Sequence, residues 1–374
     1  LLLNYAASDV RISFQLNLNR ILILPILEVR MISILILMHM KKKTLALFSA
    51  AVMAAAAMTG CSNNTAPTSP STEETTKAPE APSTEAVAET AAEEQKKELV
   101  ILGGNGAGLI AAIQAAEDGI NPSKILILSG SGELAADMKE KEDFINASET
   151  AEQFEAEIDD TYDTFLSDTL KAGKNSNNQD MAEFLVESAE EAKNWVEGLG
   201  IKLTGVEKKD GSSLARSYTL ADGGSLSEAL SEALVKKVED LKIPVKTGAE
   251  VKEIVMNADG VVTGVKAEID GTEETIDSIA VVAADKDLLP VLSGMEIQLT
   301  KAADEKATGI IVNSCAEVLD AAGEPVPGIY AVGGLIDAGV HGEAVLPGND
   351  LTATVVFGET AGVESAIYIS DNRE

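Results

Sequence analysis

A glycine-rich turn holds the residues of this sequence whose types and spacing could bind a charged ligand. Residues 103–108 read Gly-Gly-Asn-Gly-Ala-Gly and directly follow the apolar run 99–102. An alanine-rich helical pattern extends from the turn to about residue 118, and a second apolar run covers 125–128. Backbone N–H groups at the start of such a helix, together with the positive end of its dipole, attract phosphate. This order predicts a βαβ unit that binds the pyrophosphate of a dinucleotide.

Further helix and strand patterns must position this turn. We expect a mostly helical stretch over 131–173, and apolar spacings of three and four predict a helix over 181–199, capped by Asn177 or Asn178. The remaining helices are predicted over 226–241 and 351–369, and the strands at 245–247, 250–256, 261–269, 275–284 and 325–330. This alternation predicts an α/β fold with a parallel central sheet and a β-meander insertion.

The first 60 residues are predicted to contain a targeting signal and no folded domain. Residues 1–39 differ in composition from the rest, and we interpret them as an untranslated or miscalled leader. Residues 40–60 begin with three lysines after a methionine and continue into a short apolar run, which is typical of a signal peptide. Met58-Thr59-Gly60-Cys61 resembles the bacterial lipoprotein cleavage box, so we expect acylation of Cys61 to anchor the chain on the extracytoplasmic face of the cell membrane. A plain signal peptide with an incidental Cys61 is the alternative.

Composition separates a tether from a globular domain and limits the partners. Residues 61–97 are rich in Ser, Thr, Pro, Ala and Glu without an apolar period, which predicts a disordered tether before a domain at 98–374. The formal net charge of −32 argues against nucleic acid and anionic membrane surfaces as partners. Only Cys315 remains beside Cys61, so no disulfide is expected within the acylated chain. No cluster of Cys and His predicts a metal site, and the Cys-x-x-Cys-His sequence of haem attachment is absent.

The order of the motifs resembles the FAD-binding domain of the fumarate reductase and succinate dehydrogenase flavoprotein family, especially exported flavocytochrome c-like reductases. The stretches that carry the resemblance are 99–113 around the glycine turn, the helical segment 161–201, the strand pair 245–265, the strand 308–334 and the final loop and helix 339–362. The resemblance implies a Rossmann-like FAD-binding domain and names FAD as the cofactor. The family's capping domain has no room in 285–308, which we interpret as a remnant cap loop.

The resemblance also assigns cofactor-binding roles to matching positions. The implied residues are Gly103, Gly104, Asn105, Gly106, Ala107 and Gly108 at the pyrophosphate, Ser129 at the ribose, Val251 at the adenine through its backbone, and Gly333, Gly334, Gly348, Asn349 and Leu351 on the flavin side. His341 is a weak catalytic candidate, for which a structural role is favoured because no arginine partner is visible in the sequence. The other catalytic residues are unknown.

Several positions depart from the family pattern. Asn105 replaces a glycine where phosphate comes closest, and Ser129 replaces an acidic residue that takes the ribose hydroxyls. Gly334 stands where the family has glutamate, and Ala344-Val345 stands where it has Asn-Arg. We therefore expect weakened FAD affinity, which Asn105→Gly with Ser129→Glu should restore.

Two functions of different class follow from these observations. The first is an exported, lipid-anchored FAD-dependent oxidoreductase that resembles fumarate reductase, with dicarboxylate reduction not favoured. The alternative is a non-catalytic, degenerate flavoprotein that serves as a nucleotide-binding or scaffold lipoprotein. The expected partner is a redox partner or an active reductase subunit at the cell surface. A decaying gene product without function is a third hypothesis.

Overall fold

The computed structural model describes residues 96–301 and 304–373. The predicted leader, the signal peptide, Cys61 and nearly all of the tether lie outside the described residues. Within the described ranges, no helix combines the length and the apolar character that crossing a bilayer requires.

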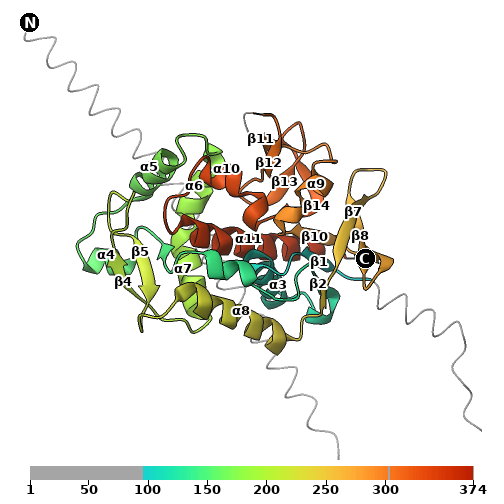
Figure 1. Ribbon diagram of the computed structural model, residues 1–374, viewed down its shortest axis with the longest axis horizontal. Helices are drawn as coiled ribbons and strands as arrows, with labels where there is room; N and C mark the ends of the chain where they lie inside the picture. The colour runs from blue at the N-terminus through green and yellow to red at the C-terminus, as the bar shows by residue number, and fades with distance from the viewer. Residues whose placement is uncertain (1–95, 302–303, 374) are drawn as a thin grey trace, which may run out of the picture. The chain divides into compact units, whose positions relative to one another are not determined.

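A six-stranded sheet forms the centre of the domain, in the order β13-β14-β10-β1-β2-β6 (Figure 1). Its strands are β1 (Leu99–Leu102), β2 (Ile125–Ser129), β6 (Val245–Thr247), β10 (Ala280–Ala283), β13 (Glu317–Leu319) and β14 (Pro325–Ala331). All neighbours pair in parallel except β13 with β14. The strands β1, β2 and β10 are buried throughout, which explains their continuous apolar sequences, because helices cover both faces of a parallel sheet. The predicted fold class is confirmed.

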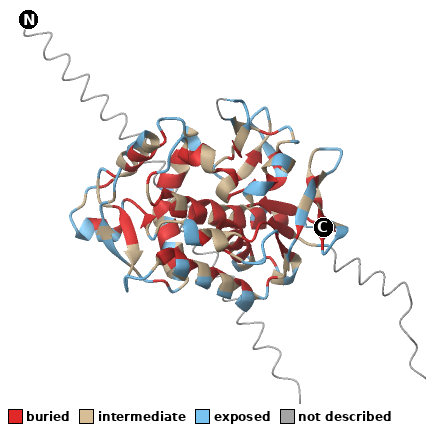
Figure 2. Ribbon diagram, viewed as in Figure 1, coloured by how far each residue is buried: buried red, intermediate tan, exposed pale blue. Residues whose placement is uncertain are grey.

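Two helices pack closely because glycines lie between them. The helix α3 (Gly106–Glu117) follows β1, and the last helix α11 (Asn349–Asn372) crosses it. A Cβ at Gly358 would lie 3.0 Å from the Ala107 carbonyl oxygen, and one at Gly362 would lie 2.7 Å from that of Ala111. Figure 2 shows that burial concentrates in the central sheet and α11. This contact fixes the start of α11 near the glycine turn.

A second region carries most of the remaining helices. Its helices are α4 (Ala151–Glu155), α5 (Tyr162–Ala172), α6 (Gln179–Glu187) and α7 (Ala189–Gly198), and its small antiparallel sheet joins β3 (Ile145–Asn146), β5 (Ser217–Leu220) and β4 (Leu203–Glu207). The 3-10 turn η2 (Ala136–Glu140) and helix α8 (Leu226–Leu241) connect it to α3. Figure 1 shows α4 and β4 at the opposite end of the domain from β7 and β8.

The remaining elements complete the sheet edges. The meander consists of β7 (Glu250–Met256), β8 (Val262–Ile269) and β9 (Thr272–Asp277); the others are η1 (Pro122–Lys124), η3 (Lys286–Leu288), α9 (Leu289–Leu292), β11 (Leu299–Lys301), β12 (Ala307–Ile310), η4 (Gly333–Leu335) and α10 (Asp337–His341). Between β10 and β12, the described residues hold only η3, α9 and β11, so this segment contains no inserted capping domain.

Three element predictions were wrong in detail. The expected strand 275–284 is two strands in different sheets, since the chain turns at Ser278 between β9 and β10. The expected helix 181–199 is interrupted at Ser188, which ends α6 and begins α7, while Asn178 caps α6 by accepting from the Met181 N–H. The stretch 131–173 is only partly helical and includes β3.

Candidate functional site

Asn105 is the helix cap of the glycine turn. Its backbone is extended (φ −81°), and its side-chain oxygen accepts a hydrogen bond from the Gly108 N–H at 2.9 Å. Its Nδ2 donates to the Ala284 carbonyl at 2.7 Å, which ties the turn to the end of β10. Gly103 has a φ of +132°, and a Cβ there would lie 2.8 Å from the Asp285 nitrogen. The amide of Asn105 therefore stabilises the turn from within, and the backbone of Asn105 itself is not left-handed.

A carboxylate occupies the N-terminus of α3. The Gly106 N–H donates to Asp137 Oδ1 at 2.9 Å, and Asp137 comes from η2. Burial raises the pKa of Asp137, and the hydrogen bond from Gly106 opposes that rise. Anions are favoured at this end of a helix. Asp137 thus takes a backbone donor that the predicted pyrophosphate would use.

Ser129 lies at the end of β2 and turns its hydroxyl toward its own loop. Its Oγ donates to the Ser131 carbonyl at 2.9 Å, and the residue is buried. A Cβ at Gly104 would lie 2.6 Å from this Oγ, so only glycine fits beside it. The hydroxyl is near the turn, as the ribose assignment requires, but it already has a partner.

A cavity of about 470 Å³ opens beside the turn and is strongly acidic. Four predicted cofactor-binding residues line it: Gly104, Asn105, Ser129 and Gly334. Six carboxylates share the lining with two lysines; they are Glu133, Asp137, Glu140, Asp285, Asp337 and Asp350, with Lys141 and Lys286. Lys141 forms an ion pair with Asp350 at 2.7 Å. This charge disfavours a pyrophosphate, because like charges in a partly buried site repel.

The other predicted cofactor residues lie outside this lining. Gly348, with a φ of +88°, donates its N–H to Glu142 at 2.7 Å, and the buried Asn349 accepts from Asn146 and donates to Thr169. Leu351, Ala107 and Gly108 are buried, Gly333 begins η4, and Val251 pairs with Ala267 in the meander. Their assigned roles stay predictions.

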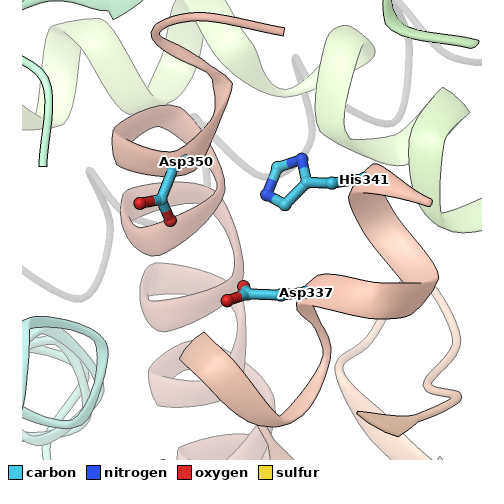
Figure 3. Close-up of side chains that lie close together, drawn as sticks. All are labelled: Asp337, His341 and Asp350. Atoms are coloured by element: carbon cyan, nitrogen blue, oxygen red, sulfur yellow. The ribbon is translucent and has the colours of Figure 1, made fainter. Parts of the chain in front are cut away.

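Three side chains from α10 and the start of α11 form a group that we call the His341 cluster: Asp337, His341 and Asp350 (Figure 3). Their possible ligand atoms all lie within 4.8 Å of one another. His341 is 2% exposed, and neither ring nitrogen has a hydrogen-bond partner among the described residues. Burial lowers the pKa of His341 to about 4, and burial followed by the charge of Asp350 raises the pKa of Asp337 to about 6. At neutral pH the imidazole is therefore uncharged.

The sequence reasoning missed the residues that give the cavity its charge. Asp337 and His341 have the i, i+4 spacing that places two side chains on one helix face, and Asp350 directly follows the Gly-Asn motif. Those two signals could have identified the cluster. No sequence pattern marked Asp137 as part of the site, because only tertiary packing brings η2 to the start of α3.

A second buried group, the Arg216 cluster, lies in the region of α5. Arg216 is fully buried, and its Nη2 lies 2.9 Å from Asp160 and 2.9 Å from Asp168. Its guanidinium carbon lies 4.5 Å from the centre of the Phe165 ring. The neighbouring Tyr218 hydroxyl is hydrogen-bonded to Thr150. Arg216 and Tyr218 are therefore held by contacts within the fold.

The glycine turn has the strand-turn-helix order of a dinucleotide site, but its glycines pack against the protein's own side chains. Gly104 and Gly106 have room for no side chain: a Cβ at Gly106 would lie 2.3 Å from Met138 Sδ. Gly104 and Asn105 of the turn line the cavity, and they lie between β1 and α3 as in a phosphate-binding βαβ unit. A pyrophosphate reaches the Gly106 N–H only after Asp137 releases it.

The FAD binding domain family model matches residues 98–288 and 295–351. A NADH:fumarate oxidoreductase of Klebsiella pneumoniae (strain 342) is 32% identical over 176 residues, which are 47% of this chain and 19% of the relative. A fumarate reductase (cytochrome) of Shewanella frigidimarina is 24% identical over 168 residues, which are 45% of this chain and 29% of the relative. This chain therefore spans less than a third of either relative.

Solved structures share the fold. The open conformation of a flavocytochrome c3 fumarate reductase superposes with a TM-score of 0.63 at 15% identity, covering 78% of this chain and 82% of that one. A 3-ketosteroid-delta4-(5alpha)-dehydrogenase from Rhodococcus jostii RHA1 gives a TM-score of 0.58 at 14% identity, with 72% and 97% covered. At these identities the likeness concerns the fold alone.

Proposed function

This chain belongs to the FAD binding domain family, and from that premise we propose that it is an exported flavoprotein that binds FAD with reduced affinity. One observation carries the proposal: Gly104 and Asn105, which connect β1 to the N-terminus of α3, line a cavity that Ser129 and Gly334 also line. The lipid anchor at Cys61 and the extracytoplasmic location are part of the proposal, supported by the signal-like sequence before that residue.

Different residues of the chain would contact different parts of the cofactor. When bound, FAD supplies hydride transfer, while the protein binds and orients it. The N-terminus of α3 and the glycine at 104 suit the pyrophosphate, because both let a phosphate approach the backbone. Lys141 and Lys286 are the cationic side chains in the cavity lining. Asp137 opposes binding, since its carboxylate accepts from the Gly106 N–H.

Reduction of a dicarboxylate is not the reaction we propose, because the arginines that such a substrate needs are occupied. Residues 96–373 contain two arginines, Arg216 and Arg373. Arg216 is buried between two aspartates, and Arg373 pairs with Glu98 at 2.8 Å. This observation favours a second candidate, a non-catalytic flavoprotein that acts beside a separate redox partner. Fumarate-dependent oxidation of a reduced viologen dye should stay at the background rate when the FAD-loaded chain is added.

A titration of FAD fluorescence with the purified chain tests the proposal. Asp137→Asn should tighten FAD binding about tenfold, because it removes a negative charge beside the pyrophosphate and weakens the bond to Gly106. Glu140→Gln is the matched control, since Glu140 lines the same cavity without a hydrogen bond to α3. Its effect should be much smaller.

Two outcomes would contradict this account. If no variant perturbs FAD fluorescence, the chain does not bind FAD in this cavity. If Asp137→Asn and Glu140→Gln change the dissociation constant for FAD equally, the cause is the loss of one negative charge from the cavity and not the loss of the hydrogen bond to Gly106. The predicted pair Asn105→Gly and Ser129→Glu provides a further comparison. We expect it to fall short alone, because Asn105→Gly also removes the cap of α3 and Asp137 remains in place.

A further inference from the structure

The His341 cluster has the composition and placement of a metal site. Asp337 and His341 lie one helical turn apart on α10, and Asp350 is the second residue of α11. Figure 3 shows the three side chains extending into one shared space from two helices. The candidate ligand atoms, one nitrogen and two carboxylate oxygens, lie within 4.8 Å of one another.

The histidine supplies an independent reason to expect a ligand. His341 is only 2% exposed, and neither of its ring nitrogens has a hydrogen-bond partner among the described residues. Nearly all buried polar atoms in folded proteins have a partner, because leaving one without a partner costs about 1–3 kcal/mol. A cation beside the two carboxylates would take one of these nitrogens as a ligand.

The two carboxylates leave coordinating capacity in the same place. Lys141 forms an ion pair with Asp350 through Oδ1 at 2.7 Å, and no partner of Asp350 Oδ2 is recorded among the described residues. Asp337 is half-buried, and no ion pair of its carboxylate is found in the described part of the chain. A divalent cation would offset these two charges more completely than Lys141 does.

The ligand types select the class of metal. One imidazole with two carboxylates suits divalent first-row transition ions, whereas Ca²⁺ and Mg²⁺ prefer oxygen ligands alone. Three protein ligands also leave a fourth position for water or substrate, which is the arrangement of catalytic zinc sites. Ligands at about 2.1 Å in a tetrahedral site lie about 3.4 Å apart, which is within the 4.8 Å limit on the distances between these atoms.

We propose that Asp337, His341 and Asp350 bind a divalent first-row transition metal ion such as Zn²⁺. The site lies at the cavity beside the glycine turn, because Asp337 and Asp350 are part of its lining. It does not depend on the proposed flavin function, since its ligands are side chains that the flavin-free chain already brings together.

The test is a competition between the untagged full chain and a chromophoric chelator for Zn²⁺, in the absence of FAD. The wild type should take up one Zn²⁺ per chain with a dissociation constant below the micromolar range, and Co²⁺ should give a visible absorption band typical of a tetrahedral site. His341→Gln and Asp337→Asn should each weaken binding by about 100-fold or more. Glu140→Gln should bind like the wild type, because Glu140 lines the same cavity outside the cluster.

Two results would overturn the proposal. One is the absence of stoichiometric uptake by the wild type, since weak binding by exposed carboxylates would not compete with the chelator. The other is uptake that both variants retain, which would place the metal elsewhere on this acidic chain. Asp337→Asn nearly preserves shape, so it keeps the test valid if His341→Gln fails to fold. Circular dichroism of each variant shows which case applies.

Discussion

The Arg216 cluster and the His341 cluster each place two aspartates around one basic side chain, and they differ in how those charges are satisfied. In the first, Arg216 Nη2 lies 2.9 Å from each carboxylate, and Asp168 also accepts from the backbone and hydroxyl of Ser213. In the second, His341 has no hydrogen bond, and Lys141 forms an ion pair with Asp350 alone. Two nitrogens of Arg216, Nε and Nη1, also lack hydrogen-bond partners, so the difference between the clusters lies in their carboxylates. Carboxylates that serve the fold have partners within it. In the His341 cluster, Asp337 has no ion pair or hydrogen bond of its carboxylate among the described residues, and Asp350 has one ion pair.

The largest effect should come from breaking the Arg216 cluster. Arg216→Met leaves two buried carboxylates without their counter-charge, so it should lower the free energy of unfolding by about 3–5 kcal/mol. Urea denaturation measures this. The control is Arg373→Met, whose exposed pair with Glu98 should be worth less than about 1 kcal/mol. Equal losses in the two variants would mean that the buried cluster does not hold the region of α5 together.

The matching change in the His341 cluster should have the opposite sign. His341→Leu removes two buried nitrogens that lack partners, so it should raise the free energy of unfolding of the metal-free chain by about 1 kcal/mol. The same variant should lose the Zn²⁺ uptake proposed above. Denaturation in the presence of a chelator separates the two effects. A loss of stability comparable to that of Arg216→Met would show that the two clusters do not differ as described.

A half-buried acid outside both clusters, Glu359, should give an effect that depends on pH. Glu359 lies on α11, and burial, with smaller contributions from the charges of Glu191 and Asp118, raises its pKa to about 7. Because the folded-state pKa lies above the unfolded value of about 4.3, the folded chain keeps this proton longer, and stability falls as the pH rises toward 7.

Glu359→Gln should therefore stabilise the chain by about 1 kcal/mol near pH 8 and have almost no effect near pH 4. Thermal unfolding of both proteins at the two pH values measures the difference. A stabilisation that is the same at both pH values would exclude the ionisation of Glu359 as its cause.

Local patterns predicted much of the fold. The helix over 226–241 and the strands at 245–247 and 250–256 have the predicted bounds, because their apolar periods and turn residues are local properties. The strand over 275–284 was wrong because β9 and β10 have similar compositions and join different sheets. Nothing in a single sequence marks which sheet a short strand enters.

Part of the cavity lining was predictable from the sequence. Gly104 and Asn105 belong to the glycine turn, whereas the family resemblance assigned Ser129 and Gly334. The charge of that cavity depends on η2, α10 and the start of α11, which meet the turn through packing between distant parts of the chain. Asp137 in particular lies 31 positions along the chain from the Gly106 N–H that it accepts from. Long-range contacts of this kind have no local signature.

The hydrogen bond between Asp137 and the Gly106 N–H affects how strongly FAD can stabilise the chain. A protein whose phosphate site is empty usually gains stability from its ligand by mass action, so its abundance follows the ligand supply. Here the chain provides its own anion at the helix end. Because this bond must break when FAD binds, FAD should slow proteolysis of the chain only at concentrations above its weakened dissociation constant.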